Sequence, residues 1–114
     1  MVNYVPERGD LVKINFNPQA GHEQTAWRPA LVISPKKYNR LFELALFCPI
    51  TTQSKELPFE VMAPNDLPIN DVILTDHLKS LDWRARQVQF ACSTVKSHPD
   101  FIEEVLARIE TLIR

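Results

Sequence analysis

The sequence predicts a mainly β fold with one C-terminal α-helix, an α+β class in which strongly bent antiparallel strands form a small, partly open barrel. Short apolar runs alternate with polar, proline-containing loops through most of the chain. Only near the C-terminus does the spacing of the apolar residues change to three and four. The length of 114 residues suits one hydrophobic core, so we expect a single domain over residues 1–114.

The first half of the chain predicts three strands. Residues 10–16, DLVKINF, mostly alternate between apolar and polar side chains, and a polar loop follows them. Residues 30–34, ALVIS, form an apolar run bounded by proline on both sides, which indicates a short central strand. Residues 36–40 are expected to form a turn or a single helical turn. Residues 42–50, FELALFCPI, are rich in side chains that fit a buried pleat.

The second half of the chain predicts shorter elements. Residues 59–63, FEVMA, and 71–76, DVILTD, indicate two strands on either side of the turn PNDLP. Residues 81–87, LDWRARQ, are expected to form a helical turn, and residues 88–95, VQFACSTV, begin with strand-like alternation. The chain up to this point is therefore predicted to be β-rich.

The C-terminal segment predicts an amphipathic helix that covers the sheet. Ser97, with Asp100 three residues later, is typical of a helix N-cap, and Pro99 is tolerated in a first turn. The apolar stripe that would face the sheet consists of Phe101, Ile102, Val105, Leu106, Ile109, Leu112 and Ile113.

Composition excludes several classes of protein. With 45% hydrophobic and 24% charged residues, a packed core rather than disorder is expected. A net charge of −1 argues against binding of nucleic acid by bulk electrostatics, so any such binding must be local. No apolar stretch approaches the length of a membrane span and the start lacks the layout of a signal peptide, so we expect a cytoplasmic protein with no membrane contact.

The chain has no pattern of residues typical of a metal or nucleotide site. HExxH, paired CxxC, a phosphate-binding glycine loop and GxSxG are all missing, and the carboxylates are not grouped as metal ligands. Cys48 and Cys92 lie within apolar runs without ligand spacing, so buried reduced thiols are expected. We therefore expect no metal and no cofactor.

Arg28 is the first candidate for catalysis, because it stands directly before Pro29 at the entry to a predicted central strand. A guanidinium stays protonated and can hold two phosphate oxygens, which suits it to stabilising the charge that develops in phosphoryl transfer. The alternative is a structural arginine that pairs with a carboxylate at a strand edge.

Thr51 and Thr52 follow another predicted strand, and their hydroxyl groups can bind phosphate oxygens without adding charge. The alternative is that they cap a turn. His22, Glu23 and Asp76 are the candidate proton carriers, since histidine titrates near neutrality and a carboxylate can act as a base when its pKa is raised. Each could instead be a solvated loop residue, and Asp76 could cap the turn after its strand.

The segment WRAR places Trp83 beside Arg84 and Arg86. An aromatic face with positive charge can stack an unpaired base and hold its backbone. The same pattern fits a core tryptophan flanked by surface arginines. Trp27, directly before Arg28, permits the same two interpretations.

Several segments together resemble the MazF and PemK toxins of bacterial toxin–antitoxin systems, and the MazF branch in particular. They occur in the family's order and spacing over nearly the whole chain and are RGDLVKINFNP, GHEQTAWRPALVISP, PITTQSKELPFEV, VILTDHLKSLDWRAR and the closing amphipathic helix.

The resemblance implies an SH3-like barrel of the CcdB and PemK type that forms a homodimer. It implies a sequence-specific endoribonuclease that cuts single-stranded RNA without metal, by attack of the 2′-hydroxyl, and so inhibits translation and growth. It also implies a cognate MazE-like antitoxin, with contact to operator DNA only through the antitoxin complex.

The resemblance also assigns site residues. Arg28, Thr51 and Glu23 match the positions implied in catalysis, whereas Leu74 stands where the PemK-like branch has an arginine two residues before the aspartate. The residues expected to contact RNA are His22, Gln24, Trp27, Thr52, Gln53, Lys55, Asp76, Lys79, Trp83, Arg84 and Arg86.

Two other functions share this predicted fold. One is a non-enzymatic toxin like the gyrase poison CcdB, whose action relies on a C-terminal tryptophan, whereas this sequence ends TLIR. The other is a degenerate barrel that serves only as a protein-binding module. The RP and TTQ segments favour the nuclease.

Overall fold

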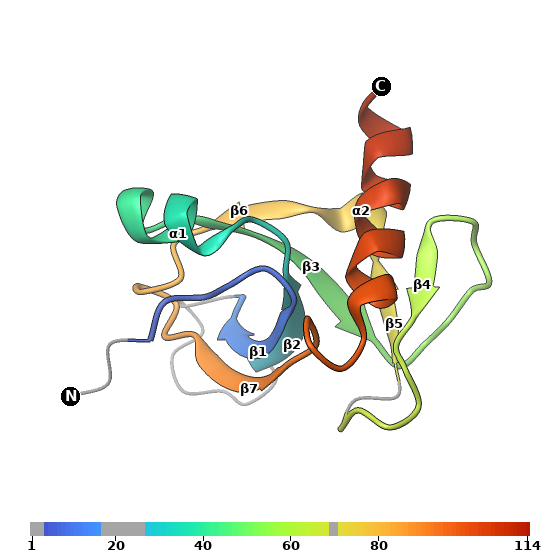
Figure 1. The fold of residues 1–114 in the computed structure, drawn as a ribbon, viewed down its shortest axis with the longest axis horizontal. Coiled ribbons are helices and arrows are strands. Elements are labelled where there is room, and N and C mark those ends of the chain that lie inside the picture. The colour runs from blue at the N-terminus through green and yellow to red at the C-terminus, as the bar shows by residue number, and fades with distance from the viewer. Residues whose placement is uncertain (1–3, 17–26, 69–70) are drawn as a thin grey trace.

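The computed structural model describes residues 4–16, 27–68 and 71–114, which form antiparallel strands and two α-helices (Figure 1). In chain order the elements are β1 (Asp10–Asn15), β2 (Trp27–Val32), α1 (Lys36–Phe42), β3 (Ala45–Thr51), β4 (Glu60–Met62), β5 (Val72–Leu74), the 3₁₀ turn η3 (Thr75–His77), β6 (Lys79–Leu81), β7 (Gln89–Ser93) and α2 (Pro99–Ile113). The predicted mainly β class with a C-terminal helix is confirmed.

Strand β3 organises the sheet. The strand order is β4-β5-β3-β2-β1-β7, and β6 also pairs with β3. Strand β2 lies along one edge of β3, while the other edge pairs first with β6, at residues 45–47, and then with β5, at residues 50–51. Cys48 and Pro49 lie between these two pairings. Pro49 has no amide hydrogen to donate. It lies where the chain between β5 and β6 leaves the ladder to form η3, so no strand partner is needed on that edge.

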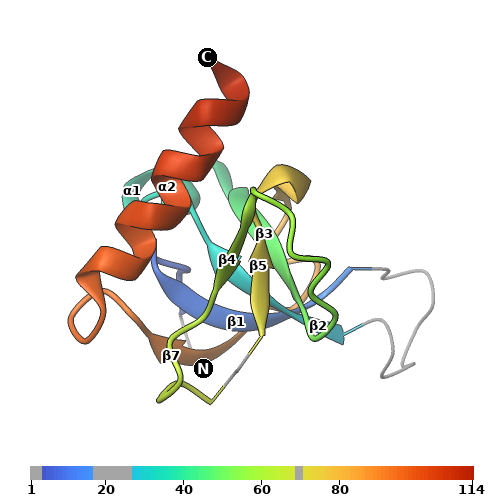
Figure 2. The same cartoon turned by 90° about the vertical axis from the view of Figure 1, so that its right-hand side faces the viewer.

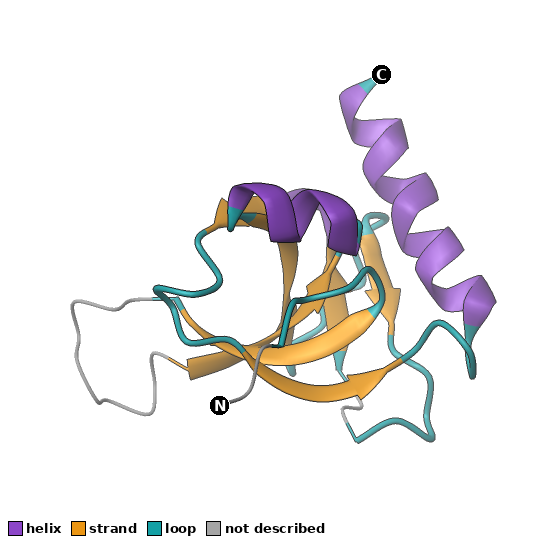
Figure 3. Cartoon of the chain, turned by 60° about the vertical axis from the view of Figure 1, so that its left-hand side comes forward, coloured by secondary structure: helices purple, strands orange, loops and turns teal. Residues whose placement is uncertain are grey.

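Two hydrophobic clusters fill the two faces of the bent sheet. Because successive strand residues point to opposite faces, neighbours such as Leu11 and Val12 belong to different clusters. The first cluster packs the apolar face of α2, including Val105 and Ile109, against the sheet (Figure 2). The second cluster, around Phe47, fills the barrel between the strands, and α1 and α2 lie on the outside (Figure 3).

The structure corrects the predicted start of the central strand. It begins at Trp27 rather than residue 30, because residues 27–29 pair with β1 and Pro29 lies opposite Lys13. The strand therefore continues through Pro29 instead of starting after it.

The structure also differs from the prediction in four other places. Residues 36–42 form a helix rather than a single turn, and it ends at Glu43, whose φ of 55° is left-handed and whose amide donates to Asn39 O. Strand β6 was not predicted, and residues 83–87 form turns rather than a helix. The N-cap of α2 is His98 without a side-chain cap bond, so the predicted role of Ser97 is wrong.

Candidate functional site

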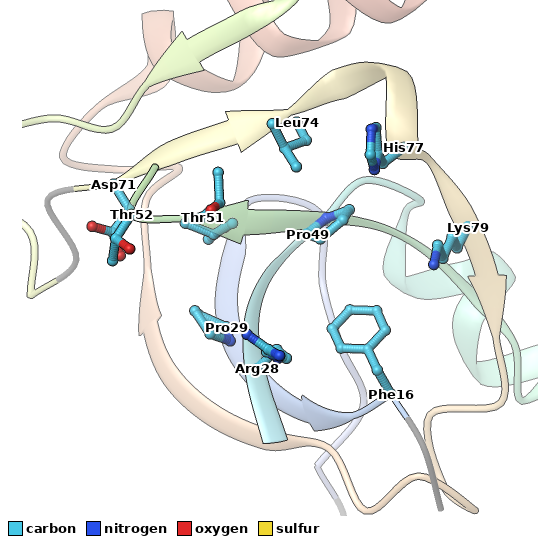
Figure 4. Close-up of a pocket in the computed structure, with 11 residues that line it drawn as sticks. Phe16, Arg28, Pro29, Pro49, Thr51, Thr52, Asp71, Leu74, His77 and Lys79 are labelled. Carbon is cyan, nitrogen blue, oxygen red and sulfur yellow. The ribbon is translucent and has the colours of Figure 1, made fainter. Parts of the chain in front are cut away.

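A cavity of about 360 Å³ opens where β2 and β3 end beside η3 (Figure 4). Arg28 and Phe16 lie on one side of it, and Leu74, His77 and Lys79 lie on the other, with β3 between them. The lining residues are Phe16, Arg28, Pro29, Pro49, Ile50, Thr51, Thr52, Asp71, Leu74, His77 and Lys79. The cavity therefore draws its walls from segments far apart in the sequence.

The register of β2 and β3 explains why Arg28 and Thr51 meet in this cavity. Ala30 pairs with Pro49 in the antiparallel ladder. Arg28 and Thr51 come two residues beyond this last pair of the ladder, and residues two apart along a strand share a face of the sheet. That face is the one that holds Ala30 and Phe47 in the second core cluster. The two predicted catalytic side chains thus lie where this core ends and solvent begins.

Arg28 is exposed and lies on a fixed backbone. It is paired with Ile14 of β1 and is followed by Pro29. Within the part of the chain that the structure describes, no carboxylate forms an ion pair with it. An exposed guanidinium without such a partner is available to bind an anionic ligand in the cavity.

Thr51 has the turn-capping role that was the alternative interpretation, and its predicted role in binding phosphate stays a prediction. Its Oγ1 accepts a hydrogen bond from the amide of Gln53 at 3.2 Å, so it does cap the turn that follows β3. A hydroxyl that accepts one bond still has its own hydrogen to donate. Thr51 can therefore hold the loop and bind an oxygen of a ligand at the same time.

A second cavity of about 270 Å³ adjoins the first and shares Thr51, Leu74 and His77 with it. Its wall contains three of the residues expected to contact RNA, namely Gln53, Lys55 and Asp76, together with apolar and acidic neighbours: Leu57, Phe59 and Glu60. Apolar and polar side chains together line both cavities.

Glu60 folds the loop that borders the second cavity. Its carboxylate accepts hydrogen bonds from Ser54 Oγ at 2.8 Å and from the amide of Lys55. These bonds, the Ser54 hydroxyl foremost, lower the pKa of Glu60, because they stabilise its ionised form. The loop that carries Gln53 and Lys55 is therefore held by one carboxylate.

Lys79 is the first residue of β6 and lines the first cavity. Its Nζ lies 5.7 Å from the centroid of the Phe16 ring. This cation–π contact holds the ammonium group across from Arg28. Phe16, Asp71 and His77 line the cavity but were not selected as site residues from the sequence. The signal for His77 was its position directly after Asp76, at the end of a predicted strand.

The WRAR segment does not line either cavity. Trp83 is 4% exposed in the second core cluster, and its Nε1 donates to Asn39 O at 3.1 Å. This is the core tryptophan of the alternative interpretation, and a buried ring is not open to a base. Arg84 pairs with Glu43 at 3.7 Å and lies over the Trp83 ring.

Arg86 does not line the cavity, but it binds the backbone of Phe16, which does. Its Nη1 donates to the backbone oxygens of Asn15 and Phe16, at 3.2 and 2.8 Å, and so fixes the end of β1. Trp27 is partly exposed at the start of β2 but is not among the lining residues. The predicted site residues His22, Glu23 and Gln24 lie outside the described residues.

Within residues 4–16, 27–68 and 71–114, no group of three or more His, Cys, Asp or Glu side chains is placed to hold a metal ion. Over the same residues, no helix has the length and apolar character needed to span a membrane. Cys48 is buried and Cys92 partly buried, and both are free thiols. Burial raises the pKa of Cys48 to about 12.

Comparisons with known proteins agree with one another. Residues 7–113 match the family described as PemK-like, MazF-like toxin of type II toxin-antitoxin system. The chain is 41% identical over 110 residues to the endoribonuclease toxin MazF of Escherichia coli strain K12, covering 96% of each chain. It is 32% identical to the endoribonuclease toxin ChpB of the same strain, covering 94% of this chain and 93% of ChpB.

Solved structures are similar over the same length. The crystal structure of MazF (Form-I) from Deinococcus radiodurans superposes with a TM-score of 0.85 at 44% identity, covering 97% of this chain and 98% of that one. The MazE-MazF complex (Form-I) from the same organism gives a TM-score of 0.82 at 38% identity, again covering 97% and 98%.

Proposed function

The chain belongs to the family of PemK-like and MazF-like toxins of type II toxin–antitoxin systems, and we propose that it is an endoribonuclease that cuts single-stranded RNA in the cavity between Arg28 and Thr51. The relatives it matches are named endoribonucleases, which supports this activity over the gyrase-poison alternative. The observation that carries the proposal is that Arg28, which has no ion pair with any described carboxylate, and the Thr51 hydroxyl line one cavity from separate strands.

The proposed reaction needs no metal. The 2′-hydroxyl of the RNA attacks the neighbouring phosphate in line, which leaves a cyclic phosphate and a free 5′-hydroxyl. DNA lacks this nucleophile, so it is not a substrate. Arg28 stabilises the charge on the phosphate, and Thr51 donates to one of its oxygens. Glu23, which the structure does not describe, is proposed as the base that accepts the 2′-hydroxyl proton.

RNA on either side of the cut would follow the two adjoining cavities. Gln53, Lys55 and Asp76 border the second cavity, and Thr52 and Lys79 border the first. Apolar lining residues such as Phe16, Leu57 and Phe59 suit a base, and the cations suit the backbone phosphates. The local positive charge would bind RNA although the whole chain carries a net charge of −1.

We also propose two protein partners. MazE-MazF complexes have been solved for relatives, and a MazE-like antitoxin that covers the cavity would block the site here; operator DNA would be contacted only through that complex. A homodimer is supported by the outer face of α2, where Leu112 and Ile113 are 49% and 74% exposed beside a hollow lined by Leu106 and Ile109. Burial of this apolar surface would favour association.

The test is cleavage of a long defined RNA, mapped by primer extension, with and without EDTA. The parent protein is expected to cut at short motifs in either condition. Arg28→Ala is expected to lose about a hundredfold in kcat, about 3 kcal/mol of transition-state stabilisation, because one preorganised donor is removed. Arg40→Ala, at an exposed arginine of α1, is the matched control and should retain the parent rate.

Two results would contradict the proposal. Parent-like cleavage by Arg28→Ala would remove the guanidinium from the reaction, and strict dependence on Mg²⁺ would refute the metal-free mechanism. A fragment with a 3′-phosphate only, formed without a cyclic intermediate, would exclude attack by the 2′-hydroxyl.

A further inference from the structure

His77 projects from η3 on the side of the cavity opposite Arg28 (Figure 4). The backbone of η3 is well fixed. Thr75 is buried, its hydroxyl donates to Phe59 O at 2.5 Å, and its amide donates to the same oxygen. The backbone that carries the imidazole is therefore well fixed, although the ring itself is half-exposed.

His77 is placed at the junction of the two cavities. It lines both of them, together with Thr51 and Leu74. Its Nε2 lies 3.8 Å from Asp76 Oδ2. A phosphate held by Arg28 and Thr51 would have this imidazole on its far side.

The other charged groups around His77 are unsuited to donating a proton at neutral pH. They are Asp76 on η3, Arg28, Asp71 and Lys79 in the first cavity, and Lys55 and Glu60 in the second. Arginine and lysine side chains ordinarily keep their protons and carboxylates ordinarily lose theirs well below neutrality. Among the described residues that line the two cavities, histidine is the one type that exchanges a proton near pH 7.

We propose, on the basis of the endoribonuclease function above, that His77 is the general acid that protonates the departing 5′-oxygen. The 2′-oxygen bonds to phosphorus as its proton passes to the base. The bond between phosphorus and the 5′-oxygen breaks as the imidazolium of His77 gives its proton to that oxygen. The products are the cyclic phosphate, the 5′-hydroxyl and a neutral imidazole, which water then reprotonates.

The test compares two substrates that differ in one atom. The first is an oligoribonucleotide that spans a site mapped with the parent protein. The second is the same oligoribonucleotide with sulfur in place of the bridging 5′-oxygen at that site. A thiolate is a far weaker base than an alkoxide, so the sulfur leaving group departs without a general acid.

His77→Gln keeps a polar side chain of similar size but cannot act as an acid. It is expected to cut the oxygen substrate about a hundredfold more slowly than the parent, within the range for loss of a general acid. It should cut the sulfur substrate within about threefold of the parent rate. Equal losses on the two substrates, or parent-like cleavage of the oxygen substrate, would overturn the assignment.

His98→Gln is the matched control, because His98 starts α2, pairs with Asp66 and lines neither cavity. It should cut both substrates like the parent. Thermal unfolding of His77→Gln should match the parent, since the ring is half-exposed. Failure of the parent itself to cut RNA would overturn both proposals, whereas equal losses on the two substrates would overturn only the role of His77.

Discussion

Substitution of Asn39 tests how the barrel is held together, because its side chain is fully buried and fully hydrogen-bonded. Its Oδ1 accepts from Ser34 Oγ at 2.5 Å, and its Nδ2 donates to Pro6 O at 2.8 Å and to Ser34 O at 3.0 Å. Its backbone oxygen accepts from Trp83. One residue of α1 therefore ties the N-terminal segment and the corner after β2 to the barrel.

Asn39→Ala removes three hydrogen bonds and leaves two buried carbonyl oxygens without this donor. At about 1 kcal/mol for each bond, plus a further cost for the unsatisfied carbonyls, we expect a loss of about 3–5 kcal/mol in the free energy of unfolding. For a domain of this length that lowers Tm by roughly 10–20 °C. Asn39→Asp keeps the volume but faces the same carbonyls with an acceptor, so it should be at least as destabilising at pH 7.

Urea and thermal unfolding followed by circular dichroism measure these changes. Asn65→Ala, the same substitution at an exposed turn residue, is the control and should stay within about 0.5 kcal/mol of the parent. Because Asn39 does not line the cavity, the variants that remain folded at low temperature should still cut RNA. A loss below about 1 kcal/mol for Asn39→Ala would refute the reasoning.

Three further predictions concern other parts of the molecule. Gly9→Ala should lower the free energy of unfolding by about 1–3 kcal/mol in a urea titration, because Gly9 has φ +91° and a Cβ would lie 2.5 Å from Val95 Cγ2; an unchanged midpoint would contradict this. Burial raises the pKa of Cys48 to about 12 and also raises that of Cys92, so at pH 8 both thiolate fractions are low. An aromatic disulfide reagent should modify at most Cys92 slowly in the native protein and both thiols in urea, and rapid native reaction of two thiols would refute the assignment of burial. Ile113→Asp should weaken self-association at least tenfold in sedimentation measurements, because it charges the apolar end of α2; an unchanged dimer would place the interface elsewhere.

The sequence predicted the strands and helix whose pattern is strong. Residues 10–16 mostly alternate between apolar and polar, and the apolar stripe of the C-terminal segment repeats at helical spacing, so β1 and α2 were both expected near their observed positions. Strand β6 was missed because it has three residues and two of them are exposed. Its existence depends on pairing with β3, which is a tertiary contact rather than a local preference.

Some residues of the candidate site could also be predicted from the sequence, and others could not. Arg28 and Thr51 could be selected because their chemistry and the family resemblance agree, whereas Trp83 could not be assigned from its own segment. The pattern of a tryptophan beside an arginine fits both a ring that stacks a base and a ring that fills a core. Only the bond to Asn39 and the burial of Trp83 distinguish the two. The sequence signal for His77 was only its position directly after Asp76, because its place in the cavity depends on where η3 lies beside β3.

The position of the cavity follows from the partners of β3. On one edge, the register with β2 places Arg28 and Thr51 two residues beyond the Ala30–Pro49 pair and on the same face, and on the other edge the chain crosses from β5 to β6 through η3. The crossing places His77 beside the same stretch of β3 that carries Thr51. A slip of one residue between β2 and β3 would turn Arg28 to the opposite face and also expose the core face of Ala30. The same register therefore sets both the stability of the barrel and the geometry of the cavity, which is why a small fold can place charged groups from three segments around one cavity.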